Sequence, residues 1–268
     1  MTEKRFVAYE LNGYVATIKI DRPERRNAID TEVAAQLKDA FLRFQDDEAA
    51  RVGILTGAHG VFCAGGDLKA IADPTRRRTY DLEGGGTGPL GPTRMFISKP
   101  LIAAVSGYAV AGGLELALLA DMRVADEDAV FGVFCRRWGV PLIDGGTVRL
   151  PRTIGMGRAL DMILTGRPVG AAEALGMGLV NRITPKGGAL ACATELAKQI
   201  AEFPQGCMLA DRQSVYDQWD VPLADALRNE GMRGTPFVIS EGAAGAARFA
   251  AGVGRHGKFE HSERREDA

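Results

Sequence analysis

One unit recurs along this sequence: a short apolar strand, a turn rich in glycine, and the first turn of a helix. Residues 52–56 form one such apolar run, and residues 102–105 form another, followed by Gly112-Gly113 and an apolar helical stretch. Strands that alternate with helices are typical of α/β proteins. The rhythm predicts this class and leaves two architectures open, a doubly wound sheet and a spiral of β-β-α turns.

The flanking segments predict a hairpin at the N-terminus and a helix after it. Residues 6–10 and 14–20 have the pattern of two strands around Asn12-Gly13, a pair that adopts positive φ in tight turns. Apolar residues then recur at helical spacing behind Asp30 or Thr31, either of which could cap a helix. Further strands are expected at 122–125, 129–131 and 179–183, and further helices near 157–164 and 171–175.

Length and composition fit one large core with a small appendage. The chain has 268 residues, of which 46% are hydrophobic and 25% charged, as in ordinary globular proteins. From about Phe203 the pattern becomes helical without a convincing strand, and the chain ends in a polar tail at 262–267. We therefore predict a core domain over residues 1–200, a helical C-terminal subdomain over residues 201–268, and a frayed end.

Charge and cysteine usage exclude several classes of partner. A net charge of -1 provides no global field that would attract nucleic acid or an anionic membrane. The four cysteines lack a C-x-x-C pair and the three histidines are scattered, so no metal site is expected. The chain starts without an apolar signal core and contains no run long enough to span a bilayer, which favours the cytoplasm.

A segment rich in arginine and glycine interrupts the pattern between Asp73 and Pro92. It contains three consecutive arginines at 76–78 and a glycine-rich run at 84–88. This composition packs poorly and predicts a mobile surface flap. Residues 86–91 match G-x-G-x-x-G, but no strand precedes them and a proline interrupts the turn, so no dinucleotide cofactor is predicted.

Two turns of small residues could present backbone N–H groups to a ligand. In the first, Gly65 and Gly66 follow a buried strand and Asp67 starts a helix. An ordinary glycine turn with Asp67 as a helix cap explains this pattern as well. In the second, Gly112 and Gly113 lead directly into a helix that is apolar nearly all round, which predicts a buried helix.

Glu115 is the one ionisable side chain of that apolar helix. It lies in the first turn, beside the N–H groups that a helix leaves free at its start. Because carboxylates are seldom buried without a role, Glu115 is a candidate acid/base. The alternative is that it caps the helix or pairs with a nearby arginine.

Several motifs in fixed order resemble the enoyl-CoA hydratase/isomerase (crotonase) family. They are residues 20–28, 62–68 and 103–109, then Gly112-Gly113 with Glu115, Phe131-Gly132, Gly145-Gly146-Thr147 with Arg149-Leu150, and residues 171–180, so the match spans about three-quarters of the chain. The resemblance implies a spiral of β-β-α turns. It also implies a C-terminal helical region that packs subunits into homotrimers, often paired into hexamers.

The same resemblance implies an acyl-CoA thioester as substrate and no separate cofactor, because coenzyme A is part of the substrate. Ala64 and Gly112 would supply the two N–H donors of an oxyanion hole, which stabilises negative charge on the thioester oxygen. Residues 64–67 would line the path of the CoA moiety. Glu115 would be the acid/base.

The sequence departs from the hydratase pattern at Cys135, where hydratases of the family have a second catalytic glutamate. A thiol, with an ordinary pKa of about 8.5, is a poorer acid/base at neutral pH, so we expect Cys135 to shape the substrate pocket. Asp144 is the candidate for a second acid, although the family's acid in this loop lies one position earlier. Asp144 could instead cap the next helix. Arg136 and Arg137 could hold a carboxylate ionised or face solvent.

The leading hypothesis is a lyase that adds water to a trans-2-enoyl-CoA, with the enolate held in the oxyanion hole. An isomerase that moves a double bond between C3 and C2 is the closest alternative, since one group that removes and returns a proton suffices. A protein that binds acyl-CoA without catalysis is a third hypothesis, motivated by Cys135. Retention of the buried Glu115 argues against it.

Overall fold

The computed structural model describes residues 4–78 and 80–254, and the chain forms two compact units that divide between Ala201 and Glu202. The predicted frayed tail lies outside the described residues, as does Thr79 of the predicted flap. The first unit contains two sheets, and the described part of the second unit is helical.

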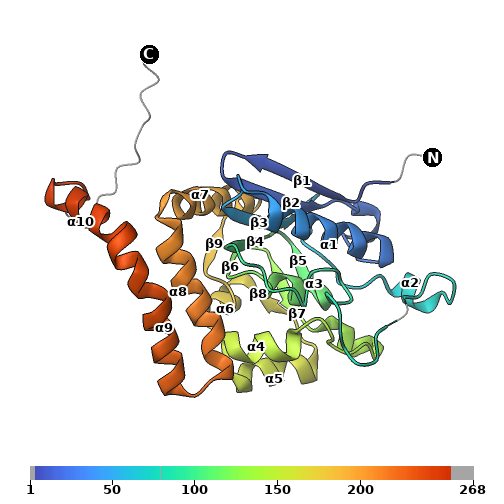
Figure 1. Ribbon diagram of the computed structural model, residues 1–268. Helices are drawn as coiled ribbons and strands as arrows, with labels where there is room; N and C mark the ends of the chain where they lie inside the picture. The colour runs from blue at the N-terminus through green and yellow to red at the C-terminus, as the bar shows by residue number, and fades with distance from the viewer. Residues whose placement is uncertain (1–3, 79, 255–268) are drawn as a thin grey trace, which may run out of the picture. The chain divides into compact units, whose positions relative to one another are not determined.

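Six strands form the larger sheet of the first unit (Figure 1). They are β1 (Val7–Asn12), β2 (Val15–Ile20), β3 (Val52–Gly57), β4 (Leu101–Val105), β6 (Met122–Asp126) and β9 (Arg182–Thr184). Their order is β1-β2-β3-β4-β6-β9, with β1 and β2 antiparallel and all other neighbours parallel. The predicted hairpin around Asn12-Gly13 is confirmed, and Gly13 has the positive φ of 58° that its turn requires.

Three shorter strands form a second sheet: β5 (Tyr108–Val110), β7 (Val130–Gly132) and β8 (Val169–Gly170). Successive turns of the chain each give one strand to the larger sheet and one to the smaller, and then form a helix. After β4 and β5 comes α3 (Gly112–Ala117), and after β6 and β7 comes the 3₁₀ helix η2 (Phe134–Trp138). One turn earlier, Cys63 makes an isolated bridge with Ala109 of β5 and leads to α2 (Leu68–Ala72). The predicted spiral of β-β-α turns is confirmed.

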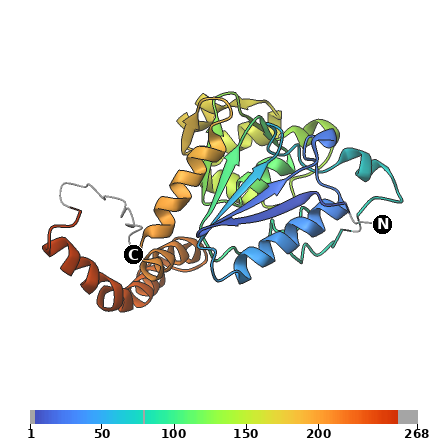
Figure 2. The same cartoon turned by 90° about the horizontal axis from the view of Figure 1, so that it is seen from above.

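The central strands β3 and β4 of the larger sheet are buried on both faces. Ile54 and Ile102 pack in one apolar cluster with α7 (Ala189–Glu202), whereas Leu55 and Leu101 pack in another that includes α1 (Thr31–Asp46) and residues of the second sheet. Burial of both faces explains the unbroken apolar runs of these strands in the sequence. Figure 2 shows α1 lying along one side of the fan of strands.

The remaining helices of the first unit are short: η1 (Pro23–Arg25), α4 (Gly146–Ile154), α5 (Met156–Thr165) and α6 (Ala171–Gly176). The helices predicted near 157–164 and 171–175 are confirmed. Asp30 is the cap of α1, because its side chain accepts the N–H of Val33. The strand expected at 179–183 begins only at Arg182, because the N–H groups of Leu179 and Val180 both donate to Ala174 at the end of α6.

The second unit consists of helices that have no buried residue. Its elements are α8 (Gln205–Asp217), the 3₁₀ helix η3 (Gln218–Asp220), α9 (Leu223–Phe237), a π-helical turn η4 (Val238–Gly242) and α10 (Ala243–Ala250). The helical character predicted from Phe203 onward is confirmed. Between residues 202 and 254 every side chain is at least partly exposed, so this unit lacks a core of its own.

Candidate active site

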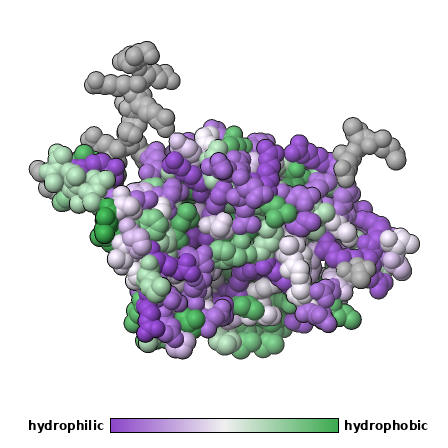
Figure 3. All heavy atoms as spheres, in the orientation of Figure 1, coloured by the Kyte–Doolittle hydropathy of each residue, from purple (hydrophilic) through white to green (hydrophobic). Residues whose placement is uncertain are grey.

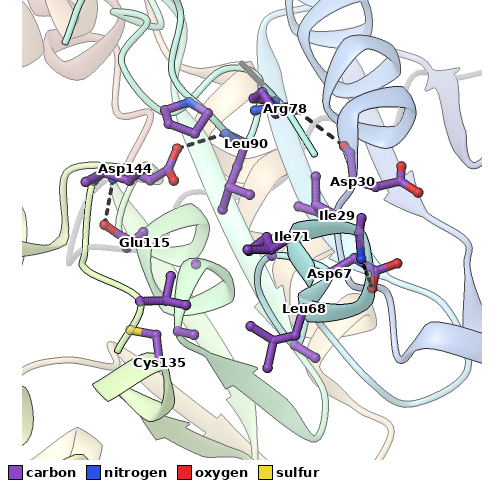
Figure 4. A pocket seen from close by; sticks show the side chains of 18 of the residues that line it. Ile29, Asp30, Asp67, Leu68, Ile71, Arg78, Leu90, Glu115, Cys135 and Asp144 are labelled. Atoms are coloured by element: carbon purple, nitrogen blue, oxygen red, sulfur yellow. Dashed lines mark hydrogen bonds between the residues drawn. The ribbon is translucent and has the colours of Figure 1, made fainter. Parts of the chain in front are cut away.

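A cavity of about 340 Å³ opens in the first unit. In Figure 4, Glu115, Cys135 and Asp144 lie on one side of it, and Asp67 and Leu68 lie on the other. The cavity brings together side chains from distant parts of the sequence. The predicted site residues that line it are Ala64, Gly66, Asp67, Gly112, Glu115, Cys135 and Asp144.

Ala64 is not free to be the predicted oxyanion donor. Its N–H donates to the backbone carbonyl of Arg26 at 3.1 Å. An N–H that already serves a carbonyl does not have a hydrogen available for a ligand oxygen. The donor role predicted for Ala64 is therefore wrong for this structure, although Ala64 does line the cavity.

Gly66 is the residue of the same turn whose N–H is uncommitted. Its neighbours are held by Ile29, which donates to the carbonyl of Gly65 at 2.8 Å and accepts the N–H of Asp67 at 2.9 Å. Within residues 4–78 and 80–254, no acceptor takes the N–H of Gly66. Because Gly66 lines the cavity, this N–H is available to a bound oxygen.

The second glycine turn supplies a matching donor at Gly112. Ala111 has φ 53° and ψ -125°, which residues with a β-carbon rarely adopt, and its N–H bonds the carbonyl of Gly132 at 2.8 Å. Gly112 follows as the first residue of α3, where a helix leaves its N–H free. A β-carbon built on Gly112 would lie 3.5 Å from the nitrogen of Gly66, so both donors belong to the same corner of the cavity.

Gly65 brings the two turns together instead of lining the cavity. It has a φ of 89°, and a β-carbon built on it would lie 2.8 Å from the nitrogen of Gly112. Only glycine permits this approach of one backbone to another. Gly65 does not occur among the described lining residues, so the predicted contact between Gly65 and the substrate is replaced by a packing role.

Glu115 is 2% exposed and is held by the end of the loop before α4 and by the first residue of α4 (Figure 4). Its Oε1 accepts the N–H of Asp144 at 2.9 Å and the N–H of Gly146 at 2.8 Å. In the part of the chain that the structure describes, the Glu115 side chain therefore neither caps its own helix nor forms a hydrogen-bonded pair with an arginine. Burial, followed by the negative charge of Asp144, raises the pKa of Glu115 to about 7. A carboxyl that titrates near neutrality can both accept and release a proton.

Asp144 lies beside Glu115, and its side chain binds a different segment. Its Oδ1 accepts the N–H of Leu90 at 2.9 Å and a short hydrogen bond from the hydroxyl of Thr93. The cap role is wrong, because Gly145 is the N-cap of α4 and no side chain bonds there. Burial raises the pKa of the Asp144 carboxyl, against the hydrogen bond from Thr93, which lowers it.

Cys135 borders the cavity from η2, as a residue that shapes the pocket would. Burial, and then the negative charge of Glu115, raise the pKa of the Cys135 thiol. The thiol therefore stays protonated at neutral pH and is a weak partner for proton transfer.

The two arginines after Cys135 are engaged away from the acids. Arg136 Nε donates to the carbonyl of Ile163 at 3.1 Å, and Arg137 Nη2 donates to the carbonyl of Gly166 at 2.9 Å. Neither arginine donates a hydrogen bond to Glu115 or Asp144. The prediction that they could hold a carboxylate ionised by such a bond is therefore not met.

Arginines also occur on the rim of the cavity. Arg26, Arg76 and Arg78 all line it, and the last two belong to the predicted flap. Arg76 pairs with the Asp30 carboxylate at 3.3 Å, and Arg78 donates to the Asp30 carbonyl at 3.4 Å. The flap therefore borders the cavity, while its mobility stays a prediction.

Leu90, Thr93 and Arg149 complete the site, and sequence reasoning gave none of them a role. Leu90 and Thr93 hold Asp144, and Arg149 donates to the carbonyls of Thr93 at 2.7 Å and Asp144 at 3.1 Å. The glycines around Leu90 indicate tight turns, but a turn motif does not reveal which distant side chain it contacts. Arg149 could have been found from its place in a family motif.

Two uncommitted N–H groups in the same cavity as a buried acid define a class of site. They can hold an oxygen on which negative charge develops while the acid moves a proton nearby. Among the described residues, no group of three or more histidine, cysteine or acidic side chains could hold a metal ion. No helix of the described part is long and apolar enough to cross a membrane.

Comparisons with known proteins identify the family that has this fold. A family model described as enoyl-CoA hydratase/isomerase matches residues 10–238. The chain is 36% identical over 241 residues to enoyl-CoA hydratase EchA19 of Mycobacterium tuberculosis, with 87% of this chain and 89% of that protein covered. It is 38% identical over 219 residues to carnitinyl-CoA dehydratase of Escherichia coli K12, with 81% and 82% covered.

Solved structures agree with the sequence comparisons. A crystal structure of enoyl-CoA hydratase from Mycobacterium tuberculosis H37Rv matches with a TM-score of 0.84 at 35% identity, covering 92% of this chain and 96% of that one. The chain belongs to the enoyl-CoA hydratase/isomerase family and is an enzyme of that family. The resemblance based on its motifs is confirmed.

Proposed function

We propose that this enzyme adds water to the double bond of a trans-2-enoyl-CoA thioester. The proposal rests on one observation: a single cavity contains two uncommitted N–H groups and a buried carboxyl with a pKa of about 7. The relatives named enoyl-CoA hydratase and carnitinyl-CoA dehydratase support this class of reaction, the addition or removal of water.

In the proposed reaction, the thioester oxygen accepts the N–H groups of Gly66 and Gly112. Attack of water at C3 moves the π electrons through C2 to this oxygen, which becomes an enolate. Donors fixed in a buried site stabilise such charge strongly, and loss of one costs about 2.7–4 kcal/mol in known cases. The strained backbone at Ala111 and the close packing at Gly65 keep the two donors in place before substrate arrives.

Glu115 takes the proton from the attacking water. Two N–H groups occupy its Oε1, which leaves Oε2 to face the water. C2 then needs a proton, and Asp144 is the candidate for the second acid. Its Oδ1 is bound by Leu90 and Thr93, so Oδ2 is the oxygen left for this transfer. Burial raises the pKa of the Asp144 carboxyl, a shift in the direction expected of a group that takes up a proton before it donates one.

An isomerase that moves a double bond between C3 and C2 is the second candidate. Cys135 favours it, because the raised pKa of this thiol leaves a protonated, poorly acidic group where hydratases have their second glutamate. Isomerisation needs one group that removes a proton and returns it, and Glu115 alone would suffice.

Turnover of two substrates separates the candidates. Purified protein is supplied with crotonyl-CoA and, separately, with a 3-enoyl-CoA, and absorbance and mass are followed. Hydration predicts that crotonyl-CoA loses its conjugated absorbance and gains the mass of one water. Isomerisation predicts that the 3-enoyl-CoA gains conjugated absorbance at constant mass. A thermal shift with acyl-CoA thioesters but no turnover of any would indicate a binding protein and exclude both.

The flap is proposed to contact the phosphates of CoA. Arg76 and Arg78 lie on the cavity rim, and their guanidinium groups are suited to phosphate oxygens. Hydrogen exchange of residues 76–88 is expected to slow when a CoA thioester binds. Equal exchange rates with and without the thioester would contradict this role.

The second unit is proposed to pack on other copies of the chain, as a homotrimer or a dimer of trimers. Large apolar side chains are exposed on its helices, including Leu227, Met232, Val238, Ile239 and Phe249. Figure 3 shows apolar surface over α10. Because apolar patches of this kind are typical of interfaces, sedimentation is expected to give the mass of three or six chains. A monomer at micromolar concentration would contradict the proposal.

A further inference from the structure

A buried ion cluster lies behind the first glycine turn. Nη2 of Arg22 is 2.8 Å from Oδ2 of Asp30 and 3.1 Å from Oδ2 of Asp67, and Arg22 and Asp67 are 5% and 4% exposed. Nη1 of Arg22 also donates to the carbonyl of Ala28 at 2.8 Å. Removing charges from water is costly, and a buried ion pair often adds no net stability over apolar side chains. The cluster therefore calls for a role other than stability.

Two atoms of this cluster have unmet hydrogen-bonding capacity. Nε of Arg22 and Oδ2 of Asp67 are buried and have no hydrogen-bond partner among the described residues. The contact between Arg22 and Asp67 is thus an attraction of charges without an aligned hydrogen bond. Unmet polar atoms are rare in native interiors, and a functional constraint is one of the reasons that maintain them.

Asp67 is fixed at both of its carboxylate oxygens. Its Oδ1 caps α2 by accepting the N–H groups of Lys69 at 3.0 Å and Ala70 at 3.3 Å. Its Oδ2 faces Arg22. Asp67 also follows Gly66 directly, so whatever fixes Asp67 limits the rotation of the Gly66 backbone.

The restriction on the Gly66 backbone matters because two consecutive glycines precede Asp67. Gly65 and Gly66 have more backbone freedom than other residues, so the direction of the Gly66 N–H must be set by the residues on either side. Backbone hydrogen bonds supply part of this, because Ile29 holds the carbonyl of Gly65 before Gly66 and the N–H of Asp67 after it, and Arg26 holds Ala64. On the C-terminal side of Gly66, the side chain of Asp67 adds a second anchor through α2 and Arg22.

We propose that Arg22 is a positioning residue, which through Asp67 fixes the direction of the Gly66 N–H. This inference rests on the proposed function, because it takes Gly66 as an oxyanion donor. Arg76 approaches the same carboxylates from the exposed side, at 3.3 Å from Asp30 and 3.8 Å from Asp67, and is 42% exposed at its side chain. Arg22 is the buried partner and therefore the one that solvent and salt screen least.

A matched pair of variants tests this role. Asp67→Asn keeps the volume and an oxygen for the cap of α2, but removes the charge that faces Arg22. Asp30→Asn removes the other charge that Arg22 holds, keeps an oxygen for the cap of α1, and lies away from Gly66 in the sequence. Both variants lose one ion pair to the same arginine, so a purely structural role predicts equal effects.

The measurement is the red shift in absorbance of a conjugated dienoyl-CoA when it binds. Hydrogen bonds to the thioester oxygen polarise the conjugated system, so the shift reports the oxyanion donors and needs no turnover. We expect Asp67→Asn to lose at least half of the wild-type shift, and Asp30→Asn to retain it. With a turned-over enoyl-CoA, kcat of Asp67→Asn should fall about tenfold, while KM changes less than about threefold.

The other possible results bear on the role of Arg22 and on the proposed hydration separately. If circular dichroism shows that both variants are folded and their red shifts are equal, Arg22 has a structural role only. If Asp67→Asn does not fold, Arg22→Lys takes its place. It keeps the charge but cannot place one nitrogen against the carbonyl of Ala28 and a second between the two carboxylates, as Nη1 and Nη2 of Arg22 do. An unchanged shift in Arg22→Lys would overturn the proposal. A wild-type shift without turnover would overturn the proposed hydration and leave this inference standing. A wild type that binds without any shift would overturn both.

Discussion

The two walls of the cavity are built in different ways. Residues 110–115 form a wall in which the backbone is set by the unusual conformation of Ala111 and the helix start at Gly112, and the Glu115 side chain is held by two hydrogen bonds. Residues 134–143 form a wall with exposed apolar side chains, among them Trp138 at 69% and Ile143 at 37%. We infer that the first wall sets the reaction and that the second meets the variable acyl group.

The largest loss of activity is expected when the acid of the first wall is removed. In Glu115→Gln we expect kcat to fall by about 10²–10⁴-fold, because the amide keeps the volume of the side chain but cannot take up a proton. Affinity for the acyl-CoA should be nearly unchanged, since most binding energy comes from the CoA body. Steady-state kinetics and calorimetric binding measure the two effects. Near-full activity in this variant would show that another group is the acid/base.

Asp144→Asn tests the junction between the two walls. We expect a loss of about 10²-fold in kcat if Asp144 is the second acid. Because the charge of Asp144 helps to raise the pKa of Glu115, its removal should lower that pKa and move the acid limb of the pH–rate profile to lower pH. A shifted profile with unchanged kcat would make Asp144 a residue that tunes Glu115 without transferring a proton.

The first wall should also carry a cost in stability that depends on pH. The pKa of Glu115 is about 7 in the fold and near 4.5 in an unfolded chain, so the fold binds the proton more tightly. Stability from this group is therefore complete below about pH 4.5 and is lost as pH rises through 7. Relative to Glu115→Gln, wild type should lose on the order of 3 kcal/mol between these limits. Urea unfolding of both proteins at pH 5 and pH 8 measures it; a constant difference would contradict the shift.

The same two walls show how far the sequence predicts the site. Glu115 could be predicted, because a single acid in an apolar helix is visible to periodicity. The periodicity left the spiral and a doubly wound sheet open, and the spiral was implied by the family resemblance that the motifs carry. The donor in the first turn was misplaced on Ala64, because which N–H a turn consumes depends on its partner at Arg26, far away in the sequence. Leu90 and Thr93 were missed for the same reason, since contacts made between loops leave no local pattern.

The smallest effect is expected at Cys135, in the second wall. Cys135→Ala should change kcat by less than about threefold, because a thiol with a raised pKa stays protonated at neutral pH and does not exchange protons readily. KM should change more than kcat, and differently for short and long acyl chains, since the substitution enlarges the cavity next to Glu115. Kinetics with enoyl-CoA thioesters of increasing length measure this. A loss of kcat comparable to that of Glu115→Gln, equal for every chain length, would place proton transfer on the thiol and assign the second wall a part in the chemistry.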